Sequence, residues 1–523
     1  MNKILNIVKF FLLFISFYLF SRLTVDDAFI SWRYGKNLVD YGIWNYNPSY
    51  FDLTQAYTNP IYAYLSVIPN YLNFNVVLFF KFFSIITTSL FLYYFFYKKI
   101  KLNNFPSILI LFLATPATMF HIFGGMETFL FVILSTLLFI FLYKNNLIYS
   151  CVATLLLFYI RPETYTLILL VPLFFLFAFK EESIFKIKLN KIGSIIVLKK
   201  KNIINSVKIF FILSIFLIPI FLINYYYFGY LWPNPYYVKV TSFFRPSELI
   251  RYLFFIMPAL YLLYIGRLKL FILIILFFIP MGWVYSNSNL MMNYHGRFLF
   301  HIYAPIFLFI LYLTYFCKDI IYYKLNNSKK YNKINQKFLI RFFLLPFVLL
   351  FLFYSSFEFR YTMTYYPRLL DAHGKLGNII KEISNREDIK SISIGDAGLL
   401  PYNSGLNSLD SLKLGSSYLA HNGIDYNIIS KYNPKILIFH TKPSSGDVRK
   451  NKSQNLLLKW AEEKNYVEVC NVVMHPQYKI KIYAFKQIKE IQNVCKISKK
   501  KNNFSHNSYF IKTFYVPPFV YWR

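Results

Sequence analysis

Acidic residues and cysteines are scarce in this sequence. Asp and Glu number 23 against 57 Lys and Arg, and charged residues make up 15% of the 523 residues. So low a charged fraction is not typical of a water-soluble globular enzyme. The four cysteines include no Cys-x-x-Cys pair, which argues against a zinc or iron–sulfur centre.

Apolar residues, in contrast, make up 57% of the chain and recur in runs long enough to cross a bilayer. The first run lacks a small-x-small cleavage site, so we interpret it as a membrane helix and not as a signal peptide. We predict eleven transmembrane segments, at about residues 4–21, 76–97, 105–121, 127–143, 147–160, 164–179, 209–227, 249–265, 270–285, 298–317 and 342–356.

The distribution of Lys and Arg predicts the orientation in the membrane. With the N-terminus in the cytoplasm, the inner loops carry 21 Lys and Arg, whereas the longer outer loops carry 7. This is the asymmetry of the positive-inside rule. It explains much of the +34 net charge, so we expect no nucleic-acid partner. The chain should lie in the inner (plasma) membrane, with its C-terminal region in the periplasm.

The sequence after the last predicted span has the pattern of a small α/β domain. The stretches "KSISIGD", "PKILIFH", "VEVCNVVM" and "YKIKIYAF" predict strands, and "LLDAHGKLGNIIKEI" and "NLLLKWAEEK" predict helices. The fold class is therefore an α-helical polytopic membrane domain over residues 1–356 with a periplasmic α/β domain over residues 357–523. Cys470 and Cys495 lie in this oxidising compartment, where they can form a disulfide or remain free.

Nearly all polar, motif-like stretches fall on the predicted outer side. They include "VDDAFISWRYGKNL", "QAYTNPIYAYL", "FGGMETF", "IRPETY", "YFGYLWPNPYYVK" and "NYHGRF", with "ISIGDAGLLPYNSG" in the C-terminal region. The predicted inner loops are plain Lys- and Asn-rich runs. Because the orientation was assigned from charge alone, this grouping indicates one site built from several outer loops.

In their order and spacing, these motifs resemble a bacterial GT-C type family of membrane glycosyltransferases. Its members use polyprenyl-phosphate sugars and include the mycobacterial terminal arabinofuranosyltransferase, and some bear the name of flagellar motor control proteins. The resemblance covers roughly residues 20–440. Two motifs depart from the family: Thr164 stands where Gly usually follows Arg-Pro-acid, and Asn234-Pro235 replaces Asn-Thr. The resemblance therefore implies the reaction class and a polyprenyl-phosphate sugar donor, and leaves the sugar open.

Asp26 and Asp27, at the end of the first apolar run, are the candidate catalytic residues. An acceptor hydroxyl is a poor nucleophile until a base begins to remove its proton, and a carboxylate also stabilises an oxocarbenium-like transition state. We favour Asp26 as the base, since related GT-C families place the base first in such a pair. The alternative is that the pair only starts a helix. Arg33, two turns after Asp26, either binds phosphate or orients the carboxylate.

Further candidates for substrate binding lie in the other outer loops. Glu127 and Glu163 stand at the starts of the fourth and sixth predicted spans and either bind substrate or cap helices. Arg161 and Arg297 are candidate phosphate ligands, because a guanidinium matches phosphate oxygens; for Arg161 the alternative is an interfacial arginine. The remaining candidates are Tyr236, for stacking on a sugar or for the aromatic belt, Lys239, for phosphate, and His295, which is otherwise a plain loop residue.

Asp396 in "GDAG" completes the candidate set. A nucleotide-binding turn is not expected there, since the Gly-x-Gly-x-x-Gly spacing is absent. We expect Asp396 and Gly398 to form a turn that faces the membrane site. No metal site is predicted, although Asp26, Asp27 and Glu127 offer oxygen ligands for a divalent cation.

Two other classes of function remain open. A transporter should show internal repeats and ionisable residues at mid-membrane depth, but the predicted spans are almost free of charge. An envelope or flagellar-motor assembly protein would not need acids and arginines that converge from separate loops. The acceptor is open as well, and can be a glycan, a glycolipid or a protein.

Overall fold

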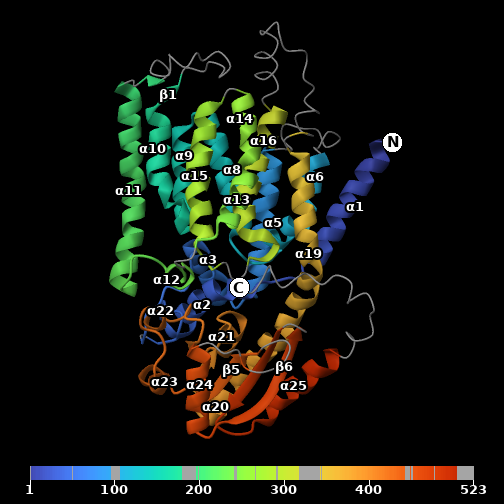
Figure 1. The fold of residues 1–523 in the computed structure, drawn as a ribbon, viewed down its shortest axis with the longest axis vertical. Helices are drawn as coiled ribbons and strands as arrows, with labels where there is room; N and C mark the ends of the chain where they lie inside the picture. The colour runs from blue at the N-terminus through green and yellow to red at the C-terminus, as the bar shows by residue number, and fades with distance from the viewer. Residues whose placement is uncertain are drawn as a thin grey trace.

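Helices dominate the computed structural model of this chain (Figure 1). The structure describes residues 2–49, 51–95, 107–179, 196–197, 200–240, 244–265, 267–289, 293–316, 342, 344–441, 448, 452–475 and 478–502.

In the first part of the chain, long helices stand side by side. The helices and short strands are α1 (Asn2–Phe20), α2 (Asp26–Tyr41), α3 (Pro60–Leu65), α4 (Val67–Tyr71), α5 (Val76–Phe95), α6 (Ser107–Leu113), α7 (Pro116–Phe123), α8 (Thr128–Tyr143), α9 (Leu147–Phe158), η3 (Pro162–Thr166), α10 (Leu167–Leu176), β1 (Ala178–Phe179), β2 (Ile196–Val197), α11 (Lys200–Phe228), α12 (Asn234–Lys239), α13 (Pro246–Ile256), η6 (Met257–Ala259), α14 (Leu260–Tyr264), α15 (Leu268–Ser286), η7 (Tyr294–Gly296), α16 (Arg297–Phe316) and α19 (Leu345–Leu369).

Five helices in the described part of the chain are long and apolar enough to cross a membrane. They cover residues 76–94, 200–228, 246–263, 268–286 and 294–315, and the bent pair α7 and α8 makes a sixth if it counts as one span. Several apolar helices are shorter, among them α9. The structure therefore supports a multi-pass membrane protein with five or six long spans, and the count of eleven stays a prediction.

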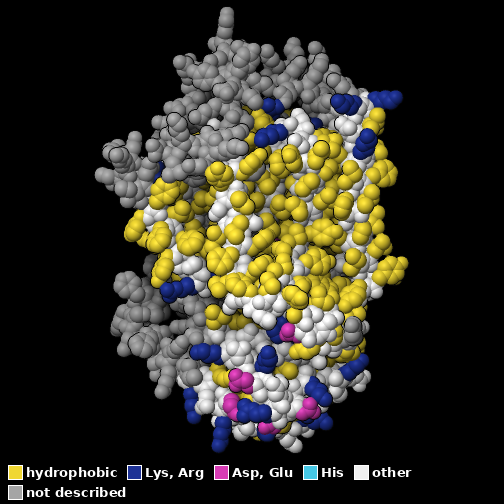
Figure 2. All heavy atoms as spheres, turned by 180° about the vertical axis from the view of Figure 1, so that it is seen from behind, with side chains coloured by type: hydrophobic (Ala, Val, Ile, Leu, Met, Phe, Trp, Pro, Cys, Tyr) yellow, Lys and Arg dark blue, Asp and Glu magenta, His cyan; other side chains and the backbone are white. Residues whose placement is uncertain are grey.

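The outer surface of these helices is strongly apolar. Figure 2 shows a broad hydrophobic band across the helical part, with Lys and Arg beyond its upper edge and mixed charges over the α/β region below. Large side chains such as Phe11, Ile215 and Tyr226 are exposed within the helical part, Tyr226 to 81%. An apolar surface of this extent is unfavourable in water and fits contact with lipid.

The C-terminal region is a mixed α/β unit, as the sequence pattern predicts. Its elements are η8 (Leu370–Gly374), α20 (Lys375–Glu387), β3 (Ser391–Ile394), α21 (Leu399–Ser404), β4 (Asn407–Asp410), α22 (Ser417–Asn422), α23 (Tyr426–Tyr432), β5 (Ile436–His440), α24 (Lys452–Glu463), β6 (Val467–His475), β7 (Tyr478–Ala484) and α25 (Lys489–Asn502). The strand order is β4-β3-β5-β7-β6, with β3 parallel to β4 and β5 and the other pairs antiparallel.

Both faces of this sheet are covered, which explains why β5 is apolar at nearly every position. Ile436 and Ile438 join the core that includes α20 and α25, whereas Leu437 and Phe439 pack with α23 and α24. Successive side chains of a strand point to opposite faces, so a strand buried on both sides has no polar alternation.

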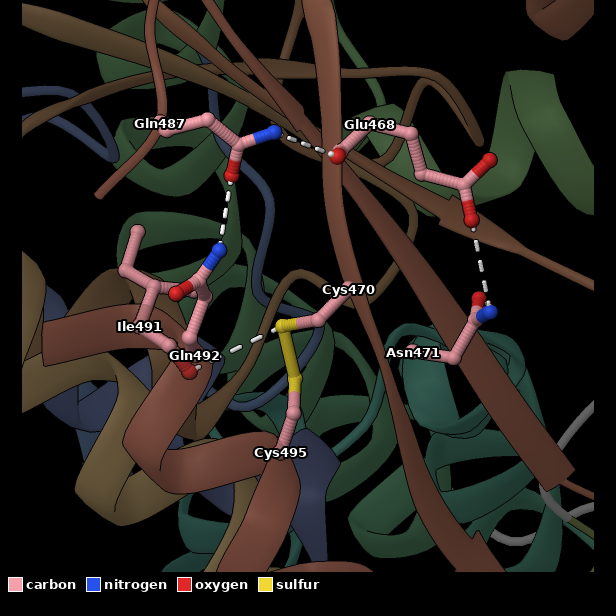
Figure 3. The surroundings of a disulfide bond; sticks show 7 residues. All are labelled: Glu468, Cys470, Asn471, Gln487, Ile491, Gln492 and Cys495. Carbon is pink, nitrogen blue, oxygen red and sulfur yellow. Dashed lines mark hydrogen bonds between the residues drawn. A yellow bond between two sulfur atoms is a disulfide. The ribbon is translucent and has the colours of Figure 1, made fainter. Parts of the chain in front are cut away.

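A disulfide ties the last helix to the edge of the sheet. Cys470 in β6 and Cys495 in α25 are bonded, 25 residues apart in the sequence (Figure 3). The pairing that the sequence left open is therefore present in the structure. Its presence is consistent with an extracytoplasmic location for this region.

The helical part and the α/β region are joined without a break at residue 356. Helix α19 runs from Leu345 to Leu369 and leads directly through η8 into α20. The α/β region also packs against α2 and the segment after it. The Tyr46 hydroxyl donates to the Ala397 carbonyl at 2.7 Å, and the Thr54 hydroxyl accepts from the Ser417 amide at 2.8 Å.

Candidate functional site

A cavity of about 320 Å³ lies where the helical part meets the α/β region. Its walls come from α2, the bend between α7 and α8, η3, α12, the end of α15 and the start of α16, with Leu414 from the α/β region. In Figure 1, α2, α3 and α12 occupy the layer between the long helices and the sheet. These are the outer loops and helix ends that the sequence groups on one side, so the structure brings them to one place.

Six charged side chains line this cavity. They are Asp27, Glu127, Arg161, Glu163, Lys239 and Arg297. Three are acidic and three basic, although acidic residues are rare in the chain. A concave site with a few convergent polar groups among aromatic and aliphatic walls is the usual form of a small-molecule site.

Glu127 is the centre of a buried ionic network in the cavity wall. Its Oε1 accepts from Arg161 Nη1 at 2.9 Å and from Arg297 Nη2 at 2.7 Å. Its Oε2 accepts from Asn59 Nδ2 at 2.6 Å, and the Ser31 hydroxyl in turn donates to Asn59 Oδ1. Because two guanidinium groups and one amide surround it, Glu127 is held as a carboxylate and fixes both arginines in position.

Arg161 binds a second carboxylate on its other edge. Its Nε and Nη2 donate to the two oxygens of Glu163 at 3.1 and 2.5 Å, a bidentate fork. Both side chains are nearly buried. Arg161 is therefore locked between two acids, whereas Arg297 has Glu127 as its ion-pair partner among the described residues.

The sharp turn before α8 brings Glu127 into this position. Helices α7 and α8 meet at 104° across a short break. Gly125 has φ +79°, a conformation that favours glycine, and an added Cβ would overlap the Trp32 ring of α2. The Val25 amide donates to the Gly124 carbonyl at 2.9 Å, so the break also adjoins the start of α2. The Gly-Gly pair thus allows the bend to lie against α2.

Asp27 is the acid of the cavity without a fixed partner. No hydrogen bond or ion pair to its carboxylate is found within the described residues, and the group faces the cavity. Burial raises the pKa of Asp27, and the charges of Lys239 and Arg297 offset this only in part. A partly shielded carboxylate with a raised pKa has the properties of a general base.

Lys239, at the end of α12, faces the same cavity. Burial lowers the pKa of its ammonium group, which Asp27 partly offsets. Its Nζ makes no hydrogen bond or ion pair with another residue that the structure describes. Lys239 and Asp27 are thus the two charged groups of the wall left for a ligand, while Glu127 and Glu163 already hold the two arginines.

Aromatic rings form one side of the cavity. Trp232 stacks against Tyr165 with ring centroids 5.9 Å apart and against Tyr236 at 5.3 Å. Tyr236 remains 42% exposed, so it lies at the edge of this wall. Such faces suit a sugar ring or an isoprenoid chain.

Seven of the eleven residues that the sequence singles out thus meet in this cavity, and four do not line it. Arg33 is one of the four. Its guanidinium donates to the Leu406 carbonyl at 2.5 Å and to Ser408 at 3.3 Å, and it lies over the Tyr46 ring. In this structure Arg33 joins α2 to the α/β region.

Two more of the four take part in buried contacts elsewhere. His295 has φ +49°, its amide donates to Glu358, and its Nε2 lies 2.7 Å from the Thr362 hydroxyl of α19. Asp396 follows β3 and faces His373 and His440. Both residues therefore contact the C-terminal part of the chain and not the cavity.

Asp26, which the sequence favours as the base, is the fourth. Its carboxylate is buried and its Oδ1 accepts from the Leu399 amide at 2.8 Å. In the alternative interpretation, the acid pair only starts a helix. Both acids do lie in the first turn of α2, but the residue before the helix is Val25 and no side chain caps it. Of the two adjacent acids, Asp27 faces the cavity and Asp26 faces the α/β region.

Several residues of the site carry no recognisable signal in the sequence. Asn59 belongs to the motif-like stretch "QAYTNPIYAYL" but is not among the candidate residues, and in the structure it bridges Ser31 to Glu127. Tyr285 lines the cavity near the end of α15, and its hydroxyl lies 3.4 Å from His301 Nδ1. Only the folded arrangement brings these groups to the acids.

Over the residues with described positions, no group of three or more His, Cys, Asp or Glu side chains is arranged to hold a metal ion. Of the three possible oxygen ligands, Asp27 and Glu127 line the same cavity, whereas Asp26 faces the α/β region.

Comparison with known proteins adds no family assignment. No protein-family model matches the chain, and no curated protein matches it either. The functional argument therefore depends on the cavity and on the motifs themselves.

Proposed function

We propose that this protein is an integral-membrane glycosyltransferase. It would transfer a sugar from a polyprenyl-phosphate donor to a hydroxyl of a glycan, glycolipid or protein on the periplasmic side. The observation that carries the proposal is the pairing in one cavity of an unpartnered carboxylate, Asp27, with cationic side chains, at the end of an apolar helical part. The donor class comes from the resemblance of the motifs to the GT-C family.

The charges of the cavity fit the steps of such a transfer. Asp27 accepts the proton of the acceptor hydroxyl as that oxygen attacks the anomeric carbon. The bond from the anomeric carbon to the phosphate oxygen breaks, and the polyprenyl phosphate leaves with the bonding electron pair. Lys239 and Arg297 stabilise the negative charge on the leaving phosphate. A single displacement of this kind inverts the anomeric centre and needs no covalent intermediate.

The remaining wall residues position these groups. Glu127 orients Arg297 and Arg161 and offsets part of their positive charge. Trp232 and Tyr236 offer a face for the sugar or for the first isoprene units. The cavity lies at the ends of the apolar helices α15 and α16, so the lipid tail can stay in the membrane while the head group enters.

The proposal is tested with the full-length protein in vesicles that contain a polyprenyl-phosphate sugar labelled in the sugar. We expect loss of labelled donor together with release of polyprenyl phosphate when envelope glycans are added as acceptors. Mass spectrometry of envelope glycans from cells with and without the protein would identify the sugar and the acceptor. Identical glycans, together with no donor turnover for any polyprenyl-phosphate sugar, would contradict the proposal.

A further inference from the structure

Outside the cavity, four titratable side chains form a chain between α2 and the sheet. His373 Nδ1 lies 3.9 Å from Asp26 Oδ1, and His373 Nε2 lies 3.3 Å from Asp396 Oδ2. The other oxygen of Asp396 lies 3.1 Å from His440 Nε2. The His373 side chain is only 1% exposed and Asp26 is similarly buried, so water screens these charges little.

The fold brings these four residues together from separate elements. Asp396 and His440 stand at the carboxyl ends of the neighbouring parallel strands β3 and β5, which meet at one edge of the sheet. His373 belongs to the π-helical turn η8 that follows α19. Gly398 lets the turn after β3 approach α2 closely, because an added Cβ would overlap the Asp26 carboxylate.

The geometry around His373 fits its protonated form. Each ring nitrogen faces a different carboxylate, and a neutral imidazole has only one N–H to donate. The imidazolium has two, one for Asp26 and one for Asp396. Burial lowers the pKa of His373, but the nearby carboxylates of Asp26 and Asp396 outweigh this and raise the pKa above its usual value.

We propose that His373 is a positioning residue that holds the first turn of α2 against the α/β region as an imidazolium between Asp26 and Asp396, and releases it when it loses its proton. We call Asp26, His373 and Asp396 the clasp. Asp27 is the next residue of the same turn, so the clasp sets where the cavity carboxylate stands. An effect of the clasp on sugar transfer, through the position of Asp27, rests on the proposed function. The contacts of the clasp do not depend on that function.

Two acids on neighbouring elements act electrostatically on His373. From α2 the charged group is Asp26, and from the turn after β3 it is Asp396, which His440 of β5 contacts on its far side. Helices α19, α20, α21 and α25 and strand β6 also pack against η8. Among the side chains that the structure describes on these elements, no other charged group acts on His373.

The direction of the pH effect follows from the raised pKa. A group whose pKa is higher in the folded than in the unfolded protein stabilises the fold fully below its unfolded pKa, about 6.5 for histidine. That contribution is lost as the pH rises through the folded pKa. The clasp should therefore be closed at pH 6 and open toward alkaline pH.

The test compares the wild type with His373→Gln, and uses Lys375→Gln as a control that removes an exposed cation from the same region. Hydrogen exchange is measured over residues 23–38 of the full-length protein in detergent, at pH 6 and pH 9. At pH 6 the His373→Gln variant should exchange severalfold faster than the wild type, because the charged contact that holds the first turn of α2 is lost. At pH 9 the two should agree, and Lys375→Gln should follow the wild type at both.

Equal ratios of exchange at the two pH values would overturn the proposal, since a purely structural role is not pH-dependent. If His373→Gln does not fold, Asp396→Asn serves instead, with the exposed Asp388→Asn as its control. Labelled-sugar transfer is measured separately. If the exchange ratio depends on pH but the wild type transfers no sugar, the clasp is supported and the proposed function is contradicted. If the wild type transfers sugar but the exchange ratio does not depend on pH, the proposed function is supported and the clasp is contradicted.

Discussion

Asp26 and Asp27 are neighbours in the sequence, yet they serve different surroundings. Consecutive residues of an α-helix point roughly 100° apart. In α2 this turns Asp27 into the cavity and Asp26 toward Leu399 and His373. The residue pattern indicates that an acid pair matters but cannot tell which acid faces a ligand, because that depends on what packs on each side of the helix.

Replacement of Asp27 by Asn should remove the general base with little effect on folding. Turnover should fall roughly 10²–10⁴-fold, the usual contribution of general-base assistance. The thermal midpoint should stay near that of the wild type, because no hydrogen bond to the carboxylate is lost among the described residues. Asp40→Asn, which changes an exposed acid of the same helix that pairs with Lys36, is the matched control. Near-wild-type turnover by Asp27→Asn would exclude it as the base.

Replacement of Glu127 by Gln should instead destabilise the protein. Both oxygens of Glu127 accept from donors, and the amide nitrogen of Gln would face either an arginine or Asn59. Removal of one partner from a buried ion pair costs about 3–5 kcal/mol. We expect a clear fall in the thermal midpoint in detergent. Glu163→Gln, which changes a more exposed ion pair, should lower the thermal midpoint less. A fall for Glu127→Gln that is no larger than the fall for Glu163→Gln would argue against the central role of Glu127.

Whole elements are predicted from the sequence with uneven success. Strands β3, β5, β6 and β7 are confirmed, whereas β4, with the sequence "NSLD", has no strand pattern and pairs in parallel with β3. The predicted span 105–121 contains α6 and α7, separated at Thr115-Pro116. Proline at the start of α7 favours this break, but periodicity alone does not reveal it.

Loss of the disulfide should loosen α25 without affecting the cavity. A closed loop of 25 residues corresponds to about 3.5 kcal/mol of stabilisation when the unfolded chain is the reference. We expect a Cys470→Ala, Cys495→Ala double variant to show faster hydrogen exchange in α25 and β6, with unchanged sugar transfer. Reducing agent should reproduce this effect in the wild type and add nothing in the double variant. A fall in transfer activity would show that the sheet edge and the cavity are coupled.

At the scale of the whole molecule, the layers were predictable and their contacts were not. The apolar band and the separate α/β region follow from composition along the chain (Figure 2). Their junction, however, depends on single polar contacts such as that of Arg33 with Leu406, far apart in the sequence. Charge patterns predict a side of the membrane, and only packing decides which loops close over a cavity.

The orientation itself gives the last prediction. Lys and Arg concentrate in the predicted inner loops, and the disulfide of the C-terminal region is consistent with an extracytoplasmic location. We therefore predict that the α/β region and the cavity lie on the periplasmic side. An alkaline phosphatase reporter fused after residue 502 should be active, because it folds only in an oxidising compartment. The same reporter inserted within the Lys-rich residues 318–341 should be inactive, and a fluorescent protein inserted there should fluoresce. The reverse result at both positions would place the cavity in the cytoplasm. A polyprenyl-phosphate sugar presented on the periplasmic face could then not reach Asp27.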